Sequence, residues 1–250
     1  MCTVVLLRRP GHAWPLILAA NRDERLDRGW DPPACWWDDR PGVMGGRDRS
    51  AGGTWMALGP AGVVAAVLNR PGSLGPTPGK RSRGDLPLLA ASEVDAAAAV
   101  RRLAALPAED WRPFNMVVAD SRDAFFLRSL GAGAVEVAAL AGGITMVTAH
   151  DPNDPDSPRI RRHLPRFRAA APPDPTAQDW RGWELLLSDD TPDAVEGPAA
   201  MLNIAPTAGF GTVCSSLIAL GDQGRATWRF CPARPAPGAF APLPLPAPVA

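Results

Sequence analysis

The sequence has no tyrosine, a single lysine at Lys80 and no surplus of either charge. Its 26 basic and 26 acidic residues give a formal net charge of +0. Proteins that bind nucleic acids or anionic membranes need a basic surplus or a basic face, so we expect neither kind of partner. The near absence of lysine, beside 29 prolines and 24 glycines, is explained by GC-rich coding and carries no functional information.

Cysteine is also scarce, and its spacing excludes the common metal motifs. The four cysteines, Cys2, Cys35, Cys214 and Cys231, form no CxxC pair and have no histidine at zinc-ligand spacing. We therefore expect no metal site and no resident cofactor. Disulfide bonds are not expected either, because no feature of the chain indicates secretion.

Long apolar runs are missing as well. No stretch approaches the ~20 apolar residues that cross a bilayer. Arg8 and Arg9 interrupt the apolar residues near the start, so this end does not resemble a signal peptide. The 46% of hydrophobic residues still suffices to bury a core. We expect a cytoplasmic protein without a membrane span; the sequence gives no indication of its oligomeric state.

Apolar runs separated by turn residues predict the order of strands and helices. An N-terminal hairpin is predicted over 2–7 and 15–20, and 31–49 and 70–83 are predicted as loops. Two helices are predicted within 86–106, with Ser92 as N-cap of the second and Asp95 completing a partial capping box. Ser157 is predicted to cap a helix over 158–170. The remaining predicted elements are strands over 54–58, 62–68, 114–119, 124–129, 134–140, 144–148, 212–220 and 226–230, and a helix over 179–187.

Strands and helices that come in segregated runs indicate an α+β fold, in which helices flank antiparallel sheets. No internal repeat and no clear boundary interrupts the chain before its Pro/Ala-rich end. We therefore expect one domain over residues 1–231. The remaining residues, 232–250, are predicted to be an extended or disordered tail.

The sharpest chemical feature is a cysteine in second position at the head of a predicted strand. Methionine is removed efficiently when a small residue follows, so the mature chain is expected to begin with Cys2. Such a residue carries a thiol together with an α-amine, whose reference pKa of about 7.7–8.0 lies close to neutral pH. The amine can then act as general base for its own thiol. A Met-Cys start on its own is a weak signal.

A polar cluster follows the second predicted strand. In a hairpin the outer ends of the two strands meet, so the segment from Asn21 to Glu24 is expected beside Cys2. Asp23 is placed to accept hydrogen bonds from the α-amine, and Asn21 to orient the amine or a substrate. Side chains alternate along a strand, so Arg22 is expected on the face opposite to Asn21 and Asp23. It is still counted among the candidate substrate-binding residues, with Asn21, Trp55 and His150. A solvated run of charges is an equally common explanation of this segment.

Further candidates lie elsewhere in the sequence. Asn69 ends a predicted strand before Pro71-Gly72, where an amide can donate to a developing oxyanion, although asparagine is also an ordinary turn residue. Trp55 is a candidate to line an apolar pocket, but tryptophans are at least as often core packing. His163 is expected on a helix surface.

Taken together, these motifs resemble the NRDE family, also called the transport and Golgi organisation protein 2 family. The resemblance spans most of the chain in consistent order. The segments that carry it are Met1-Cys2-Thr3, Asn21-Arg22-Asp23-Glu24, Gly52-Gly53-Thr54-Trp55, Leu68-Asn69, Ser82-Arg83-Gly84-Asp85-Leu86, Phe114-Asn115-Met116-Val117-Val118-Ala119-Asp120 and Gly209-Phe210-Gly211-Thr212.

That family looks like a branch of the N-terminal-nucleophile (Ntn) hydrolases, near the choloylglycine and penicillin V amidases. The resemblance implies a four-layer αββα sandwich. It implies that Cys2 is the nucleophile, that Asp23 is the partner of its amine and that Asn69 contributes to the oxyanion hole.

The chain departs from those relatives at three positions. The amidases carry an arginine three positions before the aspartate, where Ala20 stands here. Members of the NRDE family tend to carry an arginine after the late Gly-Thr pair, where Val213 stands here. A further asparagine of the amidases has His150 as its nearest polar counterpart.

Two functions therefore remain open at this point. One is a cysteine amidohydrolase that cleaves a non-peptide C–N bond, or a thioester or ester, of a small-molecule substrate. The other is a binding or trafficking protein that holds haem or a lipid-like acyl compound without turnover, with Cys2 and His150 as candidate iron ligands. The departures at Ala20 and Val213 favour the second.

Overall fold

The computed structural model describes the backbone of residues 2–246 and every side chain in that range except that of Gln223. Contacts divide the chain into two compact units. The first comprises the N-terminal segment up to Asp27, Gly142–Gly221 and Ala226–Pro244, and the second consists mainly of Arg28–Ala141. No helix within the described range is both long and apolar enough to cross a membrane.

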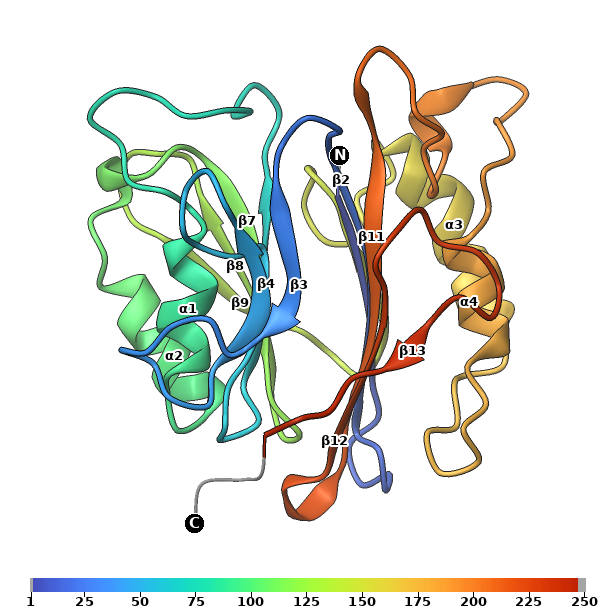
Figure 1. Cartoon of the computed structure of the whole chain (residues 1–250), viewed down its shortest axis with the longest axis horizontal. Coiled ribbons are helices and arrows are strands. Elements are labelled where there is room, and N and C mark those ends of the chain that lie inside the picture. Colours follow the sequence, from blue (N-terminus) through green and yellow to red (C-terminus); the bar gives the residue numbers. More distant parts are fainter. Residues whose placement is uncertain (1, 247–250) are drawn as a thin grey trace. The chain divides into compact units, whose positions relative to one another are not determined.

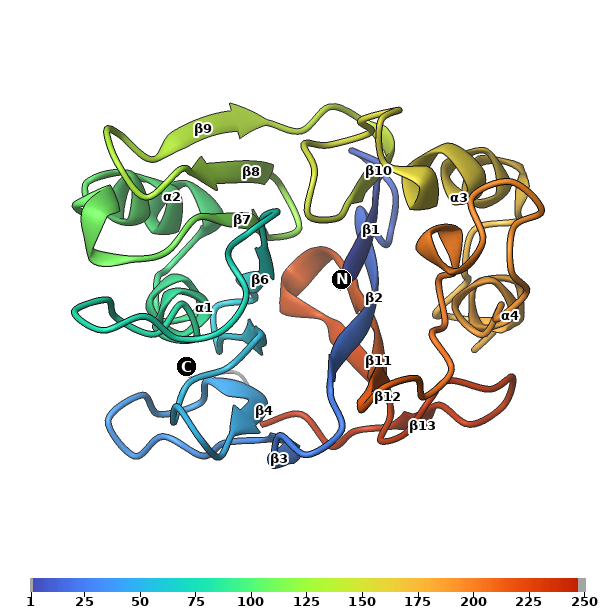
Figure 2. The ribbon, with the colours of Figure 1, turned by 90° about the horizontal axis from the view of Figure 1, so that it is seen from above.

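The first unit is built on an antiparallel sheet with the strand order β10-β1-β2-β11-β12-β13. The predicted N-terminal hairpin is present: β1 (Thr3–Arg8) pairs with β2 (Leu16–Arg25), and Thr3 lies opposite Asn21. One face of this sheet packs against α3 (Pro158–Ala169) and α4 (Arg181–Leu187), as Figures 1 and 2 show. Alternate residues of β1 and β2 supply the apolar side chains on that face.

The second unit contains a sheet with the strand order β3-β4-β5-β6-β7-β8-β9. Its helices, α1 (Asp85–Ala91) and α2 (Ala96–Ala104), pack on one face of this sheet through a separate apolar cluster. Both sheets are antiparallel and both are covered by helices, so the predicted α+β class is confirmed.

The remaining elements complete the two units. The other strands of the first unit are β10 (Gly143–Val147), β11 (Phe210–Leu220), β12 (Ala226–Cys231) and β13 (Ala241–Pro242). Those of the second are β3 (Trp30–Ala34), β4 (Met44–Asp48), β5 (Met56–Leu58), β6 (Val64–Asn69), β7 (Phe114–Ala119), β8 (Ala124–Ser129) and β9 (Glu136–Ala139). Short 3₁₀ turns occur at Ala108–Asp110, Pro198–Ala200 and Asp222–Gly224.

Two local predictions are wrong. The segment 31–49 is not a single long loop, because most of β3 and all of β4 lie within it. The prolines of β3 and the glycines of β4 suppressed the strand signal there. β3 is an edge strand, where proline is tolerated, and the glycines of β4 lie where a Cβ atom would clash with neighbouring residues. Ser92 is the C-cap of α1, whereas Asp95 caps α2 by accepting a hydrogen bond of 2.7 Å from the Ala98 N–H.

The Pro/Ala-rich C-terminal segment is extended and packed as far as it is described. It contributes β13 to the sheet of the first unit, and Phe240 is 2% exposed within the apolar cluster under α3 and α4. The Gly238 N–H donates to a carboxylate oxygen of Glu184 at 3.0 Å. The last four residues of the predicted tail, 247–250, lie outside the described residues.

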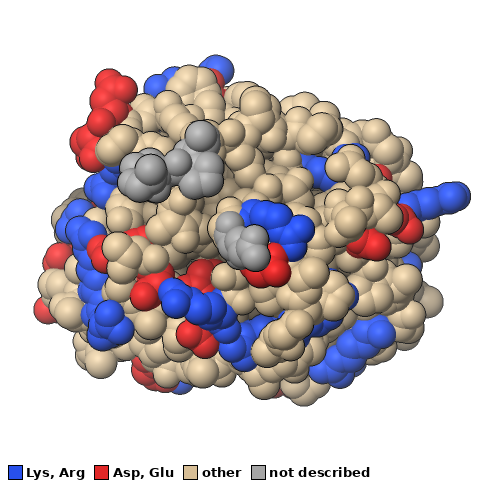
Figure 3. Space-filling view, turned by 90° about the horizontal axis from the view of Figure 1, so that it is seen from below, with Lys and Arg blue, Asp and Glu red and all other residues tan. Residues whose placement is uncertain are grey.

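Surface charges of both signs are mixed. On the face drawn in Figure 3, lysine and arginine side chains lie next to aspartate and glutamate side chains. Among the described residues, many charged side chains form ion pairs, such as Arg47 and Arg49 with Asp31. This arrangement agrees with the formal net charge of +0.

Candidate functional site around Cys2

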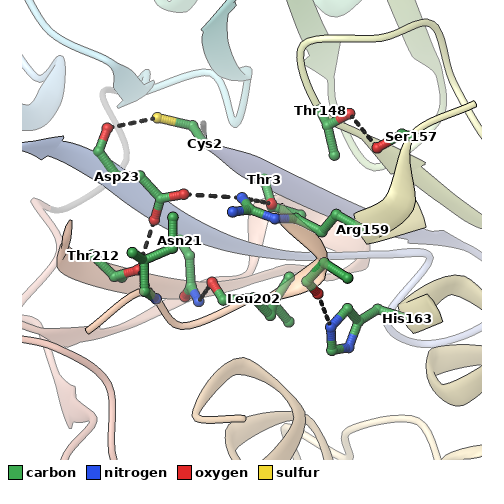
Figure 4. Close-up of polar contacts among 12 residues, drawn as sticks. Cys2, Thr3, Asn21, Asp23, Thr148, Ser157, Arg159, His163, Leu202 and Thr212 are labelled. Carbon is green, nitrogen blue, oxygen red and sulfur yellow. Dashed lines mark hydrogen bonds and ion pairs between the residues drawn. The ribbon is translucent and has the colours of Figure 1, made fainter. Parts of the chain in front are cut away.

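Cys2 lies directly before the first residue of β1 and is half-buried. Its thiol donates a hydrogen bond of 3.5 Å to the backbone carbonyl oxygen of Asp23 on β2 (Figure 4). The hairpin thus brings Cys2 to the polar segment at the end of β2, as the sequence predicts. Met1, whose removal is predicted, lies outside the described residues.

Strand alternation separates two groups of side chains around Cys2. Thr3 and Asn21 are direct partners, so they share one face of the sheet, and their neighbours Cys2 and Arg22 share the opposite face. That opposite face is the one turned away from α3 and α4. Arg22 thus lies on the face opposite to Asn21 and Asp23, as the sequence predicts, and this is the face of Cys2. Its role in substrate binding remains a prediction.

The thiol of Cys2 is held in its neutral form. Burial raises the pKa of the Cys2 thiol, the Asp23 carboxylate raises it further, and the Arg22 guanidinium partly opposes both. Arg22 is itself 5% exposed and lies 3.6 Å from a carboxylate oxygen of Glu24. A thiol in such surroundings needs a base to become a nucleophile.

The carboxylate of Asp23 is held from two sides. Arg159 of α3 donates from Nη1 to Oδ2 at 2.9 Å, and Thr212 of β11 donates from its hydroxyl to Oδ1 at 2.7 Å. The same Nη1 of Arg159 donates to the hydroxyl of Thr3 at 2.8 Å. The side chains of Asp23 and Arg159 are 0% and 3% exposed, so this is a buried and hydrogen-bonded ion pair.

A β-bulge lies beside this ion pair. The pairing of β11 with β2 shifts between Thr212 and Cys214, which leaves Val213 as the extra residue. Bulges bend a strand and redirect its side chains, and they are frequent next to functional sites. Thr212 gains a second partner there, since its hydroxyl also accepts from the Ile204 N–H at 2.8 Å.

Asn21 is not available to a substrate. Its amide nitrogen donates to the carbonyl oxygens of Leu187 at 2.9 Å and Leu202 at 3.0 Å, and its oxygen accepts from the Ser215 hydroxyl at 2.6 Å. The bonds to Leu187 and Leu202 use both N–H groups of the Asn21 amide. With 1% exposure, Asn21 ties β2 to the ends of two connecting segments, and its predicted contact with substrate is withdrawn.

His150 follows β10 at the Cys2 end of the sheet. β10 runs antiparallel to β1, and its last residue, Val147, lies opposite Val4, so 148–150 continue toward the start of β1. The imidazole Nδ1 lies 3.4 Å from a carboxylate oxygen of Asp154. His150 is half-buried, and its role in substrate binding remains a prediction.

The two other candidates belong to the second unit. Asn69 is the last residue of β6 and is half-buried. Trp55 packs edge-on against Trp30 at a centroid distance of 5.8 Å. A Cβ atom at Gly46 would lie 2.2 Å from the Trp55 ring, so only glycine lets the ring settle there. Trp55 therefore has a packing role, and both assignments to the site remain predictions.

Sequence reasoning missed Arg159, although a signal for it exists. The buried residues of α3 are Arg159, Ile160, His163, Leu164 and Phe167, which follow the spacing of one helix face. A charged residue on such an apolar stripe indicates a buried partner of opposite charge. The same stripe shows that the surface position predicted for His163 is wrong, because its side chain is fully buried.

No three His, Cys, Asp or Glu side chains among residues 2–246 cluster in a way that would hold a metal ion. The site around Cys2 is thus defined by a thiol, a buried Asp–Arg pair and the guanidinium of Arg22.

Comparison with known families decides where this chain belongs. Residues 1–229 match the family model described as Transport and Golgi organisation 2. The chain is a member of that family. The NRDE resemblance is therefore confirmed. Among curated proteins, no sequence matches the chain significantly.

Two solved structures that are similar to this chain bear on its fold. One is the Caenorhabditis elegans orthologue of N-acylethanolamine-hydrolyzing acid amidase, with a TM-score of 0.55 and 10% identity, covering 86% of this chain and 92% of the amidase. Another is a mutant of the conjugated bile acid hydrolase from Clostridium perfringens, with a TM-score of 0.48 and 10% identity, covering 92% and 88%. The likeness to the amidase shows an Ntn-hydrolase fold.

Proposed function

We propose that this protein is an N-terminal-cysteine amidohydrolase, with Cys2 as its nucleophile once Met1 is removed. The observation that carries the proposal is the contact between Cys2 and Asp23 at the paired ends of β1 and β2. This contact holds the thiol at a strand end beside the residue whose carboxylate we propose as partner of the terminal amine. The fold, shared with an acid amidase, supports it.

The proposed reaction uses the α-amine of the mature Cys2 as its base. The amine takes the proton of the thiol, and the sulfur attacks the carbonyl carbon of the substrate. The C–N bond breaks, the ammonium returns its proton to the leaving nitrogen, and an acyl thioester forms on Cys2. Water activated by the same amine then cleaves the thioester, which releases a carboxylic acid and the free thiol.

The surrounding residues have separate roles in this scheme. Asp23 keeps the amine in place by accepting hydrogen bonds, and Arg22, on the same face as Cys2, offers a cation to the substrate or to the developing thiolate. Asn69 remains our proposed oxyanion donor on the basis of its sequence motif. We infer a small N-acyl compound as substrate, since the similar amidase hydrolyses N-acylethanolamines.

The experiment starts with the intact mass of the purified protein, which establishes whether Met1 is absent. The protein is then assayed with N-acylethanolamines and related N-acyl amides of increasing chain length, and the acyl-enzyme is trapped and located by mass spectrometry. We expect acylation at Cys2 and turnover that falls by several orders of magnitude in Cys2→Ala.

The matched control is Cys35→Ser, because Cys35 is exposed and belongs to the second unit. Its turnover should equal that of the native sequence. A retained Met1, or a Cys2→Ala variant with full activity, excludes the proposal.

A second candidate, ligand binding without turnover, is favoured by Val213, which places an apolar side chain at the bulge where family members tend to carry a cation. Titration with hemin tests it. A Soret shift that depends on both Cys2 and His150, in a protein without amidase activity, would assign a haem-binding role.

A further inference from the structure

Arg159 is a cation in an unusual place. It lies in the first turn of α3, two residues after the N-cap Ser157, on the helix face that packs against the sheet. The helix dipole disfavours a positive charge near an N-terminus, and burial adds a desolvation cost. The side chain is nevertheless 3% exposed. Because the helix dipole and the loss of solvation both disfavour the guanidinium here, specific partners must stabilise it.

Its partners are the two strand ends that present Cys2. One nitrogen, Nη1, donates both to the hydroxyl of Thr3 and to the carboxylate of Asp23. Thr3 is the residue after Cys2 on β1, and Asp23 is the residue whose backbone carbonyl accepts from the Cys2 thiol. Figure 4 shows the guanidinium between these two side chains. One cation therefore joins β1 and β2 at the point where the thiol is held.

We infer that Arg159 is a positioning residue, which fixes Asp23 beside Cys2 and neutralises its charge at the thiol. The inference deepens the proposed function, on which it rests for its catalytic meaning. The cation that contacts the Asp23 carboxylate thus comes from α3, a distant part of the sequence. Arg159 acts through Asp23, since the thiol lies on the opposite face of the sheet.

The charged and titratable groups that act on Cys2 make the sign of the effect calculable. They are Asp23 and Arg22 on β2 and the terminal amine, which lowers the pKa of the thiol, with Cys214 on β11 close enough for mutual influence. Arg22 is in turn paired with Glu24. Removing Arg159 leaves the negative charge of Asp23 uncompensated, which opposes ionisation of the Cys2 thiol. Removing the carboxylate has the opposite effect.

The experiment measures the rate of Cys2 alkylation by iodoacetamide against pH in a Cys35→Ser background. Of the described cysteines, Cys214 and Cys231 are buried, so Cys2 is the accessible thiol in that background. In Arg159→Met we expect the midpoint to rise by about one pH unit, so that the rate near neutral pH falls on the order of ten-fold. Asp23→Asn should shift the midpoint downward.

Two further variants keep the test decisive if Arg159→Met fails to fold. The double variant Arg159→Met with Asp23→Asn removes both charges and should return the midpoint close to that of the background protein. Arg159→Lys keeps the positive charge, so its midpoint should also stay close to that of the background protein. The control is Arg162→Met on the same helix, whose side chain contacts Asp189 and Asp193; its profile should not change.

Identical profiles in the background protein, a folded Arg159→Met and the double variant would overturn the inference. This outcome is distinct from failure of the proposed function. If the protein hydrolyses no N-acyl compound but the midpoints shift as expected, the positioning role stands without the activity. If turnover is present and both turnover and profile are unchanged in Arg159→Met, the inference alone fails.

Discussion

Two helices, one in each unit, cover a sheet with very different side chains. The buried face of α2 consists of Ala96, Ala99, Val100 and Leu103, which are all apolar. The buried face of α3 contains Arg159 and His163 among its apolar residues. Both faces have helical spacing and both are closed to solvent. Only the second carries titratable groups, and it packs under the sheet that presents Cys2.

The difference separates packing from site construction. An apolar stripe such as that of α2 stabilises a domain by removing hydrocarbon from water and makes no demand on its partners. A buried charge must be matched by a fixed counter-charge, so it specifies geometry at a cost in stability. The counter-charge of Arg159 on α3 is Asp23 of β2. The pair therefore fixes the arrangement of the strand ends beside Cys2.

The largest expected effect comes from breaking the charge pair. Arg159→Met should lower the free energy of unfolding by about 3–5 kcal/mol, because it leaves the carboxylate of Asp23 buried without its cation. The double variant with Asp23→Asn should recover much of that loss. Urea denaturation of the two single variants and the double variant measures the coupling.

The apolar counterpart is Leu103→Ala on α2. A cavity of this kind costs about 2–5 kcal/mol, and no second substitution of a charged residue should restore it. If a second substitution restored stability to Leu103→Ala as much as Asp23→Asn does to Arg159→Met, the two helices would not differ in this respect.

A smaller effect should come from His163 and should depend on pH. Its Nε2–H donates to the Ala200 carbonyl at 2.8 Å, and its Nδ1 faces Arg166, so the neutral ring is satisfied. Burial lowers the pKa of His163 to about 4 from 6.5. The unfolded chain therefore binds a proton that the folded protein does not, and stability is lost as pH falls from 6.5 toward 4.

Between pH 7.5 and 5 this loss amounts to about 2 kcal/mol for a shift of that size. We expect His163→Gln to be less stable than the native protein at pH 7.5 but to lose less on acidification. Thermal unfolding of both proteins across this pH range measures the difference. Parallel curves would show that His163 titrates normally.

The smallest expected effect concerns the caps, where the two helices should behave alike. Asp95 accepts from the Ala98 N–H at 2.7 Å on α2, and Ser157 accepts from the Ile160 N–H at 3.4 Å on α3. Replacing either by alanine should cost about 1 kcal/mol. A much larger loss for Ser157→Ala, whose hydroxyl also lies 3.2 Å from that of Thr148, would show that the buried contact with Thr148 contributes more than the cap.

The fold was predictable where strand periodicity was strong. The strands of β7 and β8 begin and end at the predicted residues, 114–119 and 124–129, because continuous apolar runs are bounded there by clear turn residues. β3 and β4 escaped prediction because proline and glycine dominate them. Their strand conformation depends on pairing with each other and with β5, which no local pattern records.

The site was predictable in its sequence-local part only. A hairpin joins Cys2 to Asp23 over a short separation, so the pattern of two strands and a turn suffices. Arg159 and Thr212 reach Asp23 from positions 136 and 189 residues away in the sequence, and only the tertiary fold brings them there. Arg22 is a similar case, because alternation places it opposite Asp23, but only the pairing of Thr3 with Asn21 shows that this is the face of Cys2.

The division of the chain has a consequence for the order in which the protein forms during synthesis. The second unit is almost continuous in sequence, whereas the sheet that presents Cys2 joins the first residues of the chain to β11, β12 and the packed segment around Phe240. During synthesis the second unit can therefore fold before β11 and β12 have been made, whereas the sheet that contains β1 and β2 is completed only after them. Non-local pairing of this kind is slow, and the thiol reaches its final surroundings only when nearly the whole chain has been made.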